Sequence, residues 1–185
     1  MIKNNFLSVL TAWLPLALVS TLLLIGVYIA VQQDLRLSAN DPQIAIAEDS
    51  ALQLEAGATP SSIVGLVSID IAQSISTFVM VFDEGGKISA SSGILHGMPL
   101  RLPMGVLAAS LEKENRITWQ PEVGVREALV VRHYGGAHPG FVAVGRSLRE
   151  TEERIDVVGL NLGIIWLAEL VLSFFLLLCI NFFRK

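Results

Sequence analysis

The stretch RITWQPEVGVREALVVRHYGGAHPGFVAVGRSLR, residues 116–149, decides the fold of this chain. It contains three runs that alternate polar with apolar residues or are rich in β-branched residues, at 116–120, 125–134 and 141–146. Glycine and proline separate these runs where tight turns are needed. The stretch therefore predicts three consecutive antiparallel strands.

A helix is expected to begin directly after the third strand. Ser147 followed three residues later by Glu150 is a capping-box pattern. The apolar block at 157–183 follows, with Glu169 as its only charged residue. We expect one unbroken helix that leads from the sheet into a membrane span.

Two apolar blocks, residues 6–31 and 157–183, each exceed the roughly 20 residues that cross the hydrocarbon core of a bilayer. The first is too long for the apolar region of a signal peptide and has no small-residue cleavage pattern. The sequence therefore predicts two transmembrane helices in the lipid bilayer. A central domain at 32–156 lies between them, with short tails at 1–5 and 184–185.

The orientation of the spans depends on few charges. Lys3 precedes the first block, and Arg184 and Lys185 follow the second. The positive-inside rule places both ends in the cytoplasm and the central domain on the outer side of the cytoplasmic (inner) membrane. Cys179 is the only cysteine and lies within the second block, so the central domain has no internal disulfide. A net charge of −4 without a basic patch argues against nucleic-acid binding.

The remaining elements complete an α+β domain with a five-stranded antiparallel sheet and N-terminal helices. Helical spacing and the Asp41–Pro42 start predict a helix at 41–57, and Pro60 begins a second one at 60–76. The later elements are a β-hairpin with strands at 77–83 and 88–92, a loop at 93–103 and a helix at 104–115.

This order of elements resembles that of the extracytoplasmic PAS-like (single Cache, or PDC) sensor domains of bacterial histidine kinases and chemoreceptors. The resemblance covers roughly residues 41–153 and rests on element order. The phrases NDPQIAIAEDSA, TWQPEVGVREALVV and GFVAVGRSLRETEER also resemble those of a group of small bacterial two-span membrane proteins, which suggests no activity. Sensor kinases and receptors continue past the second span into an output module. Here only two residues follow, so any signal is expected to pass to a separate protein.

The resemblance implies a ligand pocket between the sheet and the segment at 93–103. Arginine pairs bidentately with carboxylates, so a small organic acid is the expected ligand. The candidate ligand contacts are His96, Arg101, Trp119, Arg126, Arg132 and Tyr134, with Arg146 as a further arginine of the strands.

Two alternatives remain open for this set. Alternation places Arg126, Arg132 and Tyr134 on one face of their strand, but neither face is cleanly apolar, so the core-facing side is undecided. The arginines can instead lie on a solvated face, balanced by Glu122 and Glu127. A tryptophan such as Trp119 is more often a core or interface anchor than a ligand contact.

Glu169 is expected near the midpoint of the second span, where a charge costs at least about 2.5–3.5 kcal/mol. Antiparallel spans would place it at the depth of Ser20 and Thr21, so we expect a protonated carboxyl that contacts these hydroxyls or a partner protein. The structural alternative is that the neutral Glu169 carboxyl forms its hydrogen bonds within the pair of spans and has no functional role.

No catalytic motif is present, and an enzyme is not expected. His96, His133 and His138 could form a metal site or a pH switch, but their spacing fits no ligand motif, so neither metal nor cofactor is expected. The sequence predicts a membrane-anchored sensor that signals to a membrane protein partner or works as a homodimer. A structural or assembly accessory that uses its domain as an interaction surface is the alternative.

Overall fold

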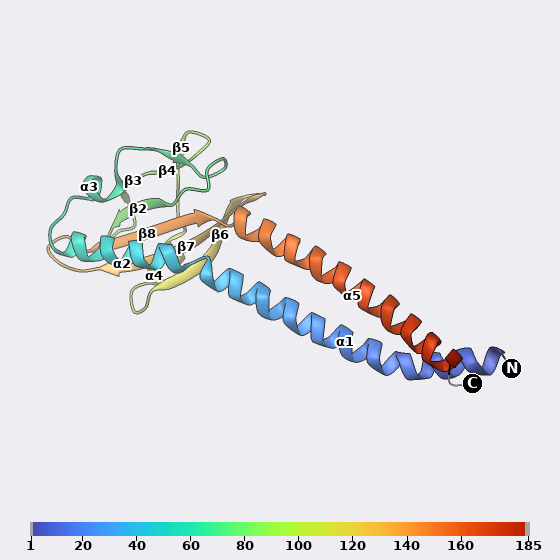
Figure 1. Cartoon of the computed structure of the whole chain (residues 1–185). Helices are drawn as coiled ribbons and strands as arrows, with labels where there is room; N and C mark the ends of the chain where they lie inside the picture. The colour runs from blue at the N-terminus through green and yellow to red at the C-terminus, as the bar shows by residue number, and fades with distance from the viewer. Residues whose placement is uncertain (1, 184–185) are drawn as a thin grey trace. The chain divides into compact units, whose positions relative to one another are not determined.

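The structure, a computed structural model, describes the backbone of residues 2–183 and the side chains from Phe6 onward. The Lys3 side chain and the residues Arg184 and Lys185, on which the expected orientation depends, lie outside this description. The chain divides into two compact units (Figure 1). Arg36–Glu152 form the sheet domain. The residues before and after it form the helical pair.

The helical pair consists of most of α1 (Ile2–Ser38) and most of α5 (Arg149–Phe183). The two helices are antiparallel, because Trp13 Nε1 donates to Ser173 Oγ at 2.9 Å while Trp166 Nε1 donates to Thr21 Oγ1 at 2.9 Å. Both are long and apolar enough to cross a membrane, as the sequence predicts.

The sheet domain contains a five-stranded antiparallel sheet in the order β3-β2-β8-β7-β6. The three strands predicted in the deciding stretch and the predicted hairpin before them are all present. Their bounds are β2 (Phe78–Asp83), β3 (Ile88–Ser91), β6 (Asn115–Glu122), β7 (Val125–Tyr134) and β8 (Gly140–Ser147).

Both faces of the central strands are buried. Helix α2 (Asp41–Glu55) covers one face, which we call the helix face, where Ala47, Ala51 and Leu54 pack in one cluster with Val130 and Val142. The opposite face, which we call the core face, carries the larger cluster. Its members on the sheet are Phe78, Met80, Phe82, Val125, Leu129, Val131, Phe141 and Ala143. The sequence of β7 has no cleanly apolar face to choose as the buried one, because both faces of this strand pack against apolar residues.

The segment between β3 and β6 covers the core face. It begins with β4 (Gly93–Leu95) and β5 (Met98–Pro99), which form a small sheet with β1 (Ile69–Asp70). From this segment Leu100 and Leu107 are buried in the core-face cluster. The loop predicted at 93–103 therefore contains a small β-hairpin.

Two predicted helices are shorter than expected. The helix predicted at 60–76 is only α3 (Pro60–Val64), because Gly65 leaves the helical region with φ 74° and the chain then becomes extended. The helix predicted at 104–115 is only α4 (Met104–Ala108). Leu107 is its one buried residue and Leu111 is exposed, so no apolar face supports a longer helix.

Helix α5 begins two residues after Ser147, the residue predicted to start the capping box. It starts at Arg149, whose backbone N–H donates to Ser147 Oγ at 3.3 Å. The Glu150 carboxylate accepts a hydrogen bond from Arg146 at 2.8 Å.

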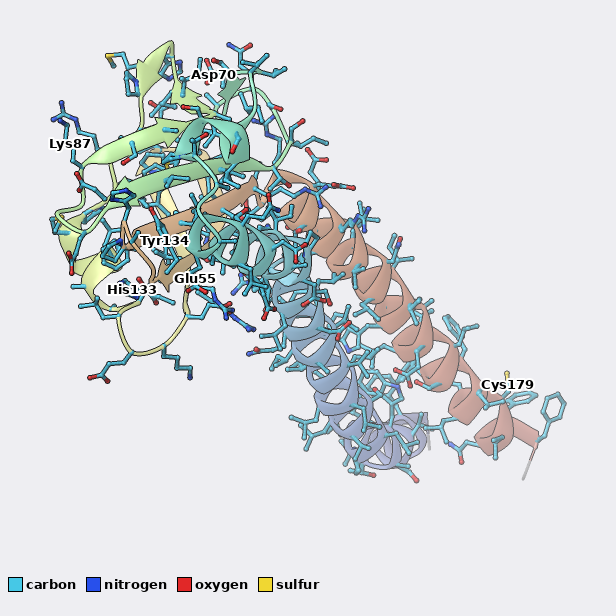
Figure 2. All side chains as sticks on the ribbon, turned by 90° about the vertical axis from the view of Figure 1, so that its left-hand side faces the viewer. Glu55, Asp70, Lys87, His133, Tyr134 and Cys179 are labelled. Carbon is cyan, nitrogen blue, oxygen red and sulfur yellow. The ribbon has the colours of Figure 1, made fainter. Side chains whose placement is uncertain are left out.

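The other end of the sheet is closed by a contact between α2 and the β7–β8 turn. Glu55 at the end of α2 accepts a hydrogen bond from the Gly135 backbone N–H at 3.1 Å, and Tyr134 lies beside it (Figure 2). The Tyr134 hydroxyl points at the Phe82 carbonyl oxygen at 3.4 Å. Burial, and secondly the Asp83 carboxylate, raise the pKa of Tyr134.

Candidate functional site

A pocket of about 420 Å³ lies between the β4–β5 hairpin and the end of β6. Its hairpin wall includes Leu95, Pro99 and Leu100, and Trp119 and Pro121 form the wall on β6. Arg101 lies at the pocket as its one charged lining residue. The pocket is thus apolar with a single cationic group, which suits an organic anion with an apolar part.

The hairpin that forms one wall is held by its turn. His96 and Gly97, with φ 50° and 77°, are the two central residues of this turn, which is the type I′ geometry of tight hairpins. The His96 Nε2 atom lies 2.9 Å from Glu122 Oε1, so the turn is attached to the end of β6. His96 therefore fixes the pocket wall and does not line the pocket.

Trp119 lies where β6 loses its regular pairing. The register of β6 and β7 shifts between Trp119 and Glu122, which makes a bulge that contains Pro121. Trp119 packs against the core-face cluster on one side and lines the pocket on the other. Both expected roles, anchor and ligand contact, are therefore compatible with its position.

Arg101 is exposed and makes no hydrogen bond or ion pair within the described residues. The other arginines of the candidate set are paired. Arg126 binds Glu152, and Arg132 lies 3.8 Å from Glu48 and 3.7 Å from Glu114. Arg101 is the member of the set whose charge is available to an anion.

The six candidate residues do not form one site. Arg101 and Trp119 share the pocket, and His96 supports it. Arg126, Arg132 and Tyr134 follow the alternation of β7 onto the helix face, the side opposite to the core face. Tyr134 is buried there as part of the core.

Glu127 is not the surface charge that the sequence suggested as a counter-ion for the arginines. It lies on the core face with an exposed fraction of 1%, directly across from Trp119 on β6 and Ser147 on β8. Neither of its carboxyl oxygens has a hydrogen-bond partner within the described residues. Burial raises the pKa of Glu127 to about 8, although the nearby Arg149 guanidinium lowers it.

Ionic contacts attach the first turn of α5 to the sheet domain. Arg126 of β7 binds Glu152, and Arg146 of β8 binds Glu150. Arg149 Nη2 donates to the Ala72 carbonyl oxygen at 2.7 Å. The beginning of α5 is therefore held by groups from two strands and from the segment after β1.

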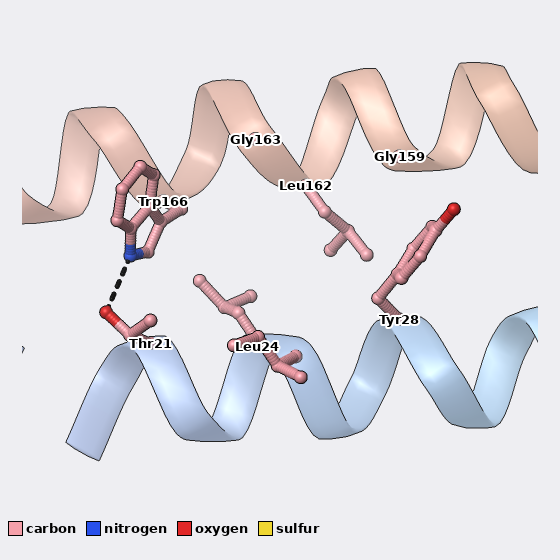
Figure 3. A pocket seen from close by; sticks show the side chains of 8 residues that line it. Thr21, Leu24, Tyr28, Gly159, Leu162, Gly163 and Trp166 are labelled. Carbon is pink, nitrogen blue, oxygen red and sulfur yellow. Dashed lines mark hydrogen bonds between the residues drawn. The ribbon is translucent and has the colours of Figure 1, made fainter. Parts of the chain in front are cut away.

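The predicted intramembrane contacts have other partners. The hydroxyls of Ser20 and Thr21 both donate to the Ala17 carbonyl oxygen, at 3.1 and 2.6 Å. Thr21 also accepts a hydrogen bond from Trp166 (Figure 3). Glu169 Oε2 is buried without a partner in the described part of the chain.

A second cavity, of about 490 Å³, lies between α1 and α5 within the helical pair (Figure 3). Leu24, Tyr28, Leu162 and Trp166 line it together with Gly159 and Gly163. Its lining is apolar apart from the Thr21 and Tyr28 hydroxyls and the Trp166 N–H, so it has no charged group that would select a ligand.

Comparisons of the chain with protein-family models, with curated proteins and with solved structures found no significant match. A functional proposal for this chain therefore depends on the geometry described above.

Sequence reasoning missed Glu127 and Trp166. Glu127 stands between Arg126 and Ala128 in a strand whose buried face was undecided, so its burial had no local signal. Trp166 lies three residues after an N-L-G segment of an apolar block and looks like any membrane aromatic. Only the pairing of the two helices shows that its N–H reaches Thr21.

Proposed function

We propose that the chain is a membrane-anchored sensor whose PAS-like domain binds a small organic anion and signals through its two membrane helices to a separate protein. The observation that carries this proposal is the apolar pocket in which Trp119 and the unpaired Arg101 come together. An unpaired guanidinium beside an aromatic wall suits a carboxylate with a hydrocarbon or aromatic part.

The strand order supports a PAS-like assignment. The five strands of this sheet can be numbered 1 to 5 in the order in which they occur in the chain. The spatial order β3-β2-β8-β7-β6 then becomes 2-1-5-4-3, which is the order of PAS-like sheets. The pocket involves the segment after the second of these strands, where the resemblance implies ligand contacts. Apolar side chains fill the core face, so the pocket lies at the β6 edge of the sheet.

The connections to the apolar helices support signalling. Only Leu148 separates β8 from α5, and only Ala39 and Asn40 separate α1 from α2. A conformational change in β8 or α2 therefore does not have to pass through a long flexible linker to reach α5 or α1. We place the domain outside the cytoplasmic membrane, with both chain ends in the cytoplasm and a membrane protein or a second copy as the receiver.

Ligand binding is tested on the full chain in lipid nanodiscs, with Trp119 as the only tryptophan after Trp13→Phe and Trp166→Phe. Monocarboxylates with graded hydrocarbon and aromatic groups are titrated while the Trp119 emission and the unfolding temperature are followed. A ligand at 100 times its dissociation constant should stabilise the folded domain by about 2.7 kcal/mol. Arg101→Gln should weaken binding by at least tenfold, because it removes the only charge of the pocket.

Lys87→Gln is the matched control, because it also removes one exposed positive charge, in the β2–β3 turn outside the pocket lining (Figure 2). It should leave the affinity unchanged. An equal loss in both variants would show only nonspecific attraction of anions. Absence of binding by every acid in the series would count against the sensor proposal.

One observation favours the alternative, an accessory protein that binds another protein through its domain. Leu66 and Val67, between α3 and β1, have exposed fractions of 102% and 75%. Adjacent apolar residues so exposed are typical of interaction surfaces. Loss of a co-purifying membrane partner in Leu66→Ser/Val67→Ser, with carboxylate binding absent from the unaltered chain, would favour this alternative.

A further inference from the structure

The Glu127 carboxyl is a buried titratable group that ligand binding at the pocket does not use. It has an exposed fraction of 1%, and neither oxygen has a hydrogen-bond partner within the described residues. An ionised carboxylate in such a place is costly, whereas a neutral carboxyl is tolerated. The folded domain therefore favours the protonated form.

Among the described residues, the charge that acts on Glu127 is the Arg149 guanidinium. Its neighbours on the core face are Trp119 of β6 and Ser147 of β8, and α4 carries no titratable residue. The carboxylates of α2 lie on the helix face, where Glu48 is within 4 Å of Arg132. Asp70, the last residue of β1, accepts a hydrogen bond from the Ala72 backbone N–H at 3.1 Å. On α5 the charge that acts on Glu127 is Arg149.

Arg149 has two competing uses. While Glu127 is neutral, Arg149 donates to the Ala72 carbonyl oxygen at 2.7 Å and so attaches the segment after β1 to the start of α5. Arg146 supports the same segment by donating to the Ile75 carbonyl oxygen at 3.2 Å. An anionic Glu127 would attract the guanidinium more strongly than a neutral carbonyl does.

We propose that Glu127 is a proton sensor: loss of its proton to solvent draws Arg149 away from Ala72 and loosens the first turn of α5. The proton is the only species released, and the positive charge that compensates the new carboxylate is already in the chain. This function is separate from ligand binding and is tested without any ligand.

The test uses the full chain in lipid nanodiscs with Trp119 as the only tryptophan, since Trp119 lies directly across from Glu127. Its emission should follow a single-proton transition with a midpoint near pH 8. Glu127→Gln should abolish the transition because it keeps the neutral shape. Arg149→Gln should move the midpoint to higher pH because it removes the charge that favours the carboxylate.

The relay to α5 is measured by hydrogen–deuterium exchange, corrected for the intrinsic pH dependence of exchange. The protection of residues 149–152, including the Glu152 amide bonded to the Leu148 carbonyl, should fall above the midpoint in the unaltered chain and stay constant in Glu127→Gln. Emission that titrates while this protection stays constant would overturn the relay.

Glu112→Gln is the matched control, because it neutralises an exposed carboxylate outside the pocket lining and should leave the midpoint near pH 8. Carbon-13 NMR of glutamate-labelled, unaltered chain reads the carboxyl directly and does not depend on whether a variant folds. The proposal is overturned if no glutamate titrates above pH 7 there, or if Glu127→Gln keeps the emission transition.

Discussion

Raising the pH from 5 to 9 should destabilise the sheet domain by up to about 5 kcal/mol relative to the Glu127→Gln variant. The pKa of Glu127 is about 8 in the folded domain and near 4.5 in an unfolded chain. Between these values the folded state binds the additional proton, so the free energy of unfolding falls as the pH rises through this window. A difference of about 3.5 pKa units at about 1.4 kcal/mol each gives the upper value.

The measurement is urea unfolding of the full chain followed by Trp119 emission at pH 5, 7 and 9. As the pH rises, the free energy of unfolding of the unaltered chain should fall relative to that of Glu127→Gln. At pH 9 the glutamine variant should be clearly the more stable of the two. Parallel pH dependence in both chains would show that Glu127 is solvated in the folded state, contrary to its burial.

Replacing Phe78 with alanine should cost about 3–5 kcal/mol of unfolding free energy, the typical cost for a buried phenylalanine. Phe78 is fully buried in the core-face cluster, and its ring lies over Gly145 of β8 and Gly93 of β4. A side-chain carbon added at Gly145 would lie 2.2 Å from this ring, and one added at Gly93 would lie 2.8 Å from it. Because they have no side chain, the two glycines leave the space that the Phe78 ring occupies.

The same geometry predicts coupling between the two positions. Gly145→Ala should be strongly destabilising by itself, because its methyl group overlaps the Phe78 ring. In Phe78→Ala the ring is absent, so adding Gly145→Ala should cost little or partly refill the cavity. A double-mutant cycle measured by urea unfolding should give a coupling energy above about 1 kcal/mol. Additive costs would show that the ring does not occupy this space.

Gly124→Ala serves as the control for the loss of a glycine. Its φ of 88° makes alanine unfavourable there, but an added side-chain carbon would meet no atom within 4 Å. Gly124→Ala should therefore lower the free energy of unfolding by about 1 kcal/mol through backbone strain alone. This loss should be the same whether residue 78 is phenylalanine or alanine. Coupling between residues 124 and 78 would indicate a global rearrangement instead of a steric overlap.

The sequence by itself determined the elements whose signals are local. Residues 116–149 contain the strands β6, β7 and β8 almost at their predicted bounds, because alternation and turn residues act within the strand itself. The apolar blocks determined the two long helices for the same reason, since length and composition suffice to identify them. The pocket residues Arg101 and Trp119 were also found from sequence, through their residue types and the segment that carries them.

The tertiary structure decided which face of each strand is buried and which charges are paired. Period-2 alternation divides β7 into two sets, but only the packing of α2 on one face and of α4 on the other shows that both are covered. This packing assigned Arg126 and Arg132 to the helix face and buried Glu127 on the core face. Burial and ion pairing depend on neighbours that are distant in sequence, such as Glu48 for Arg132 and Trp119 for Glu127, so no local pattern encodes them.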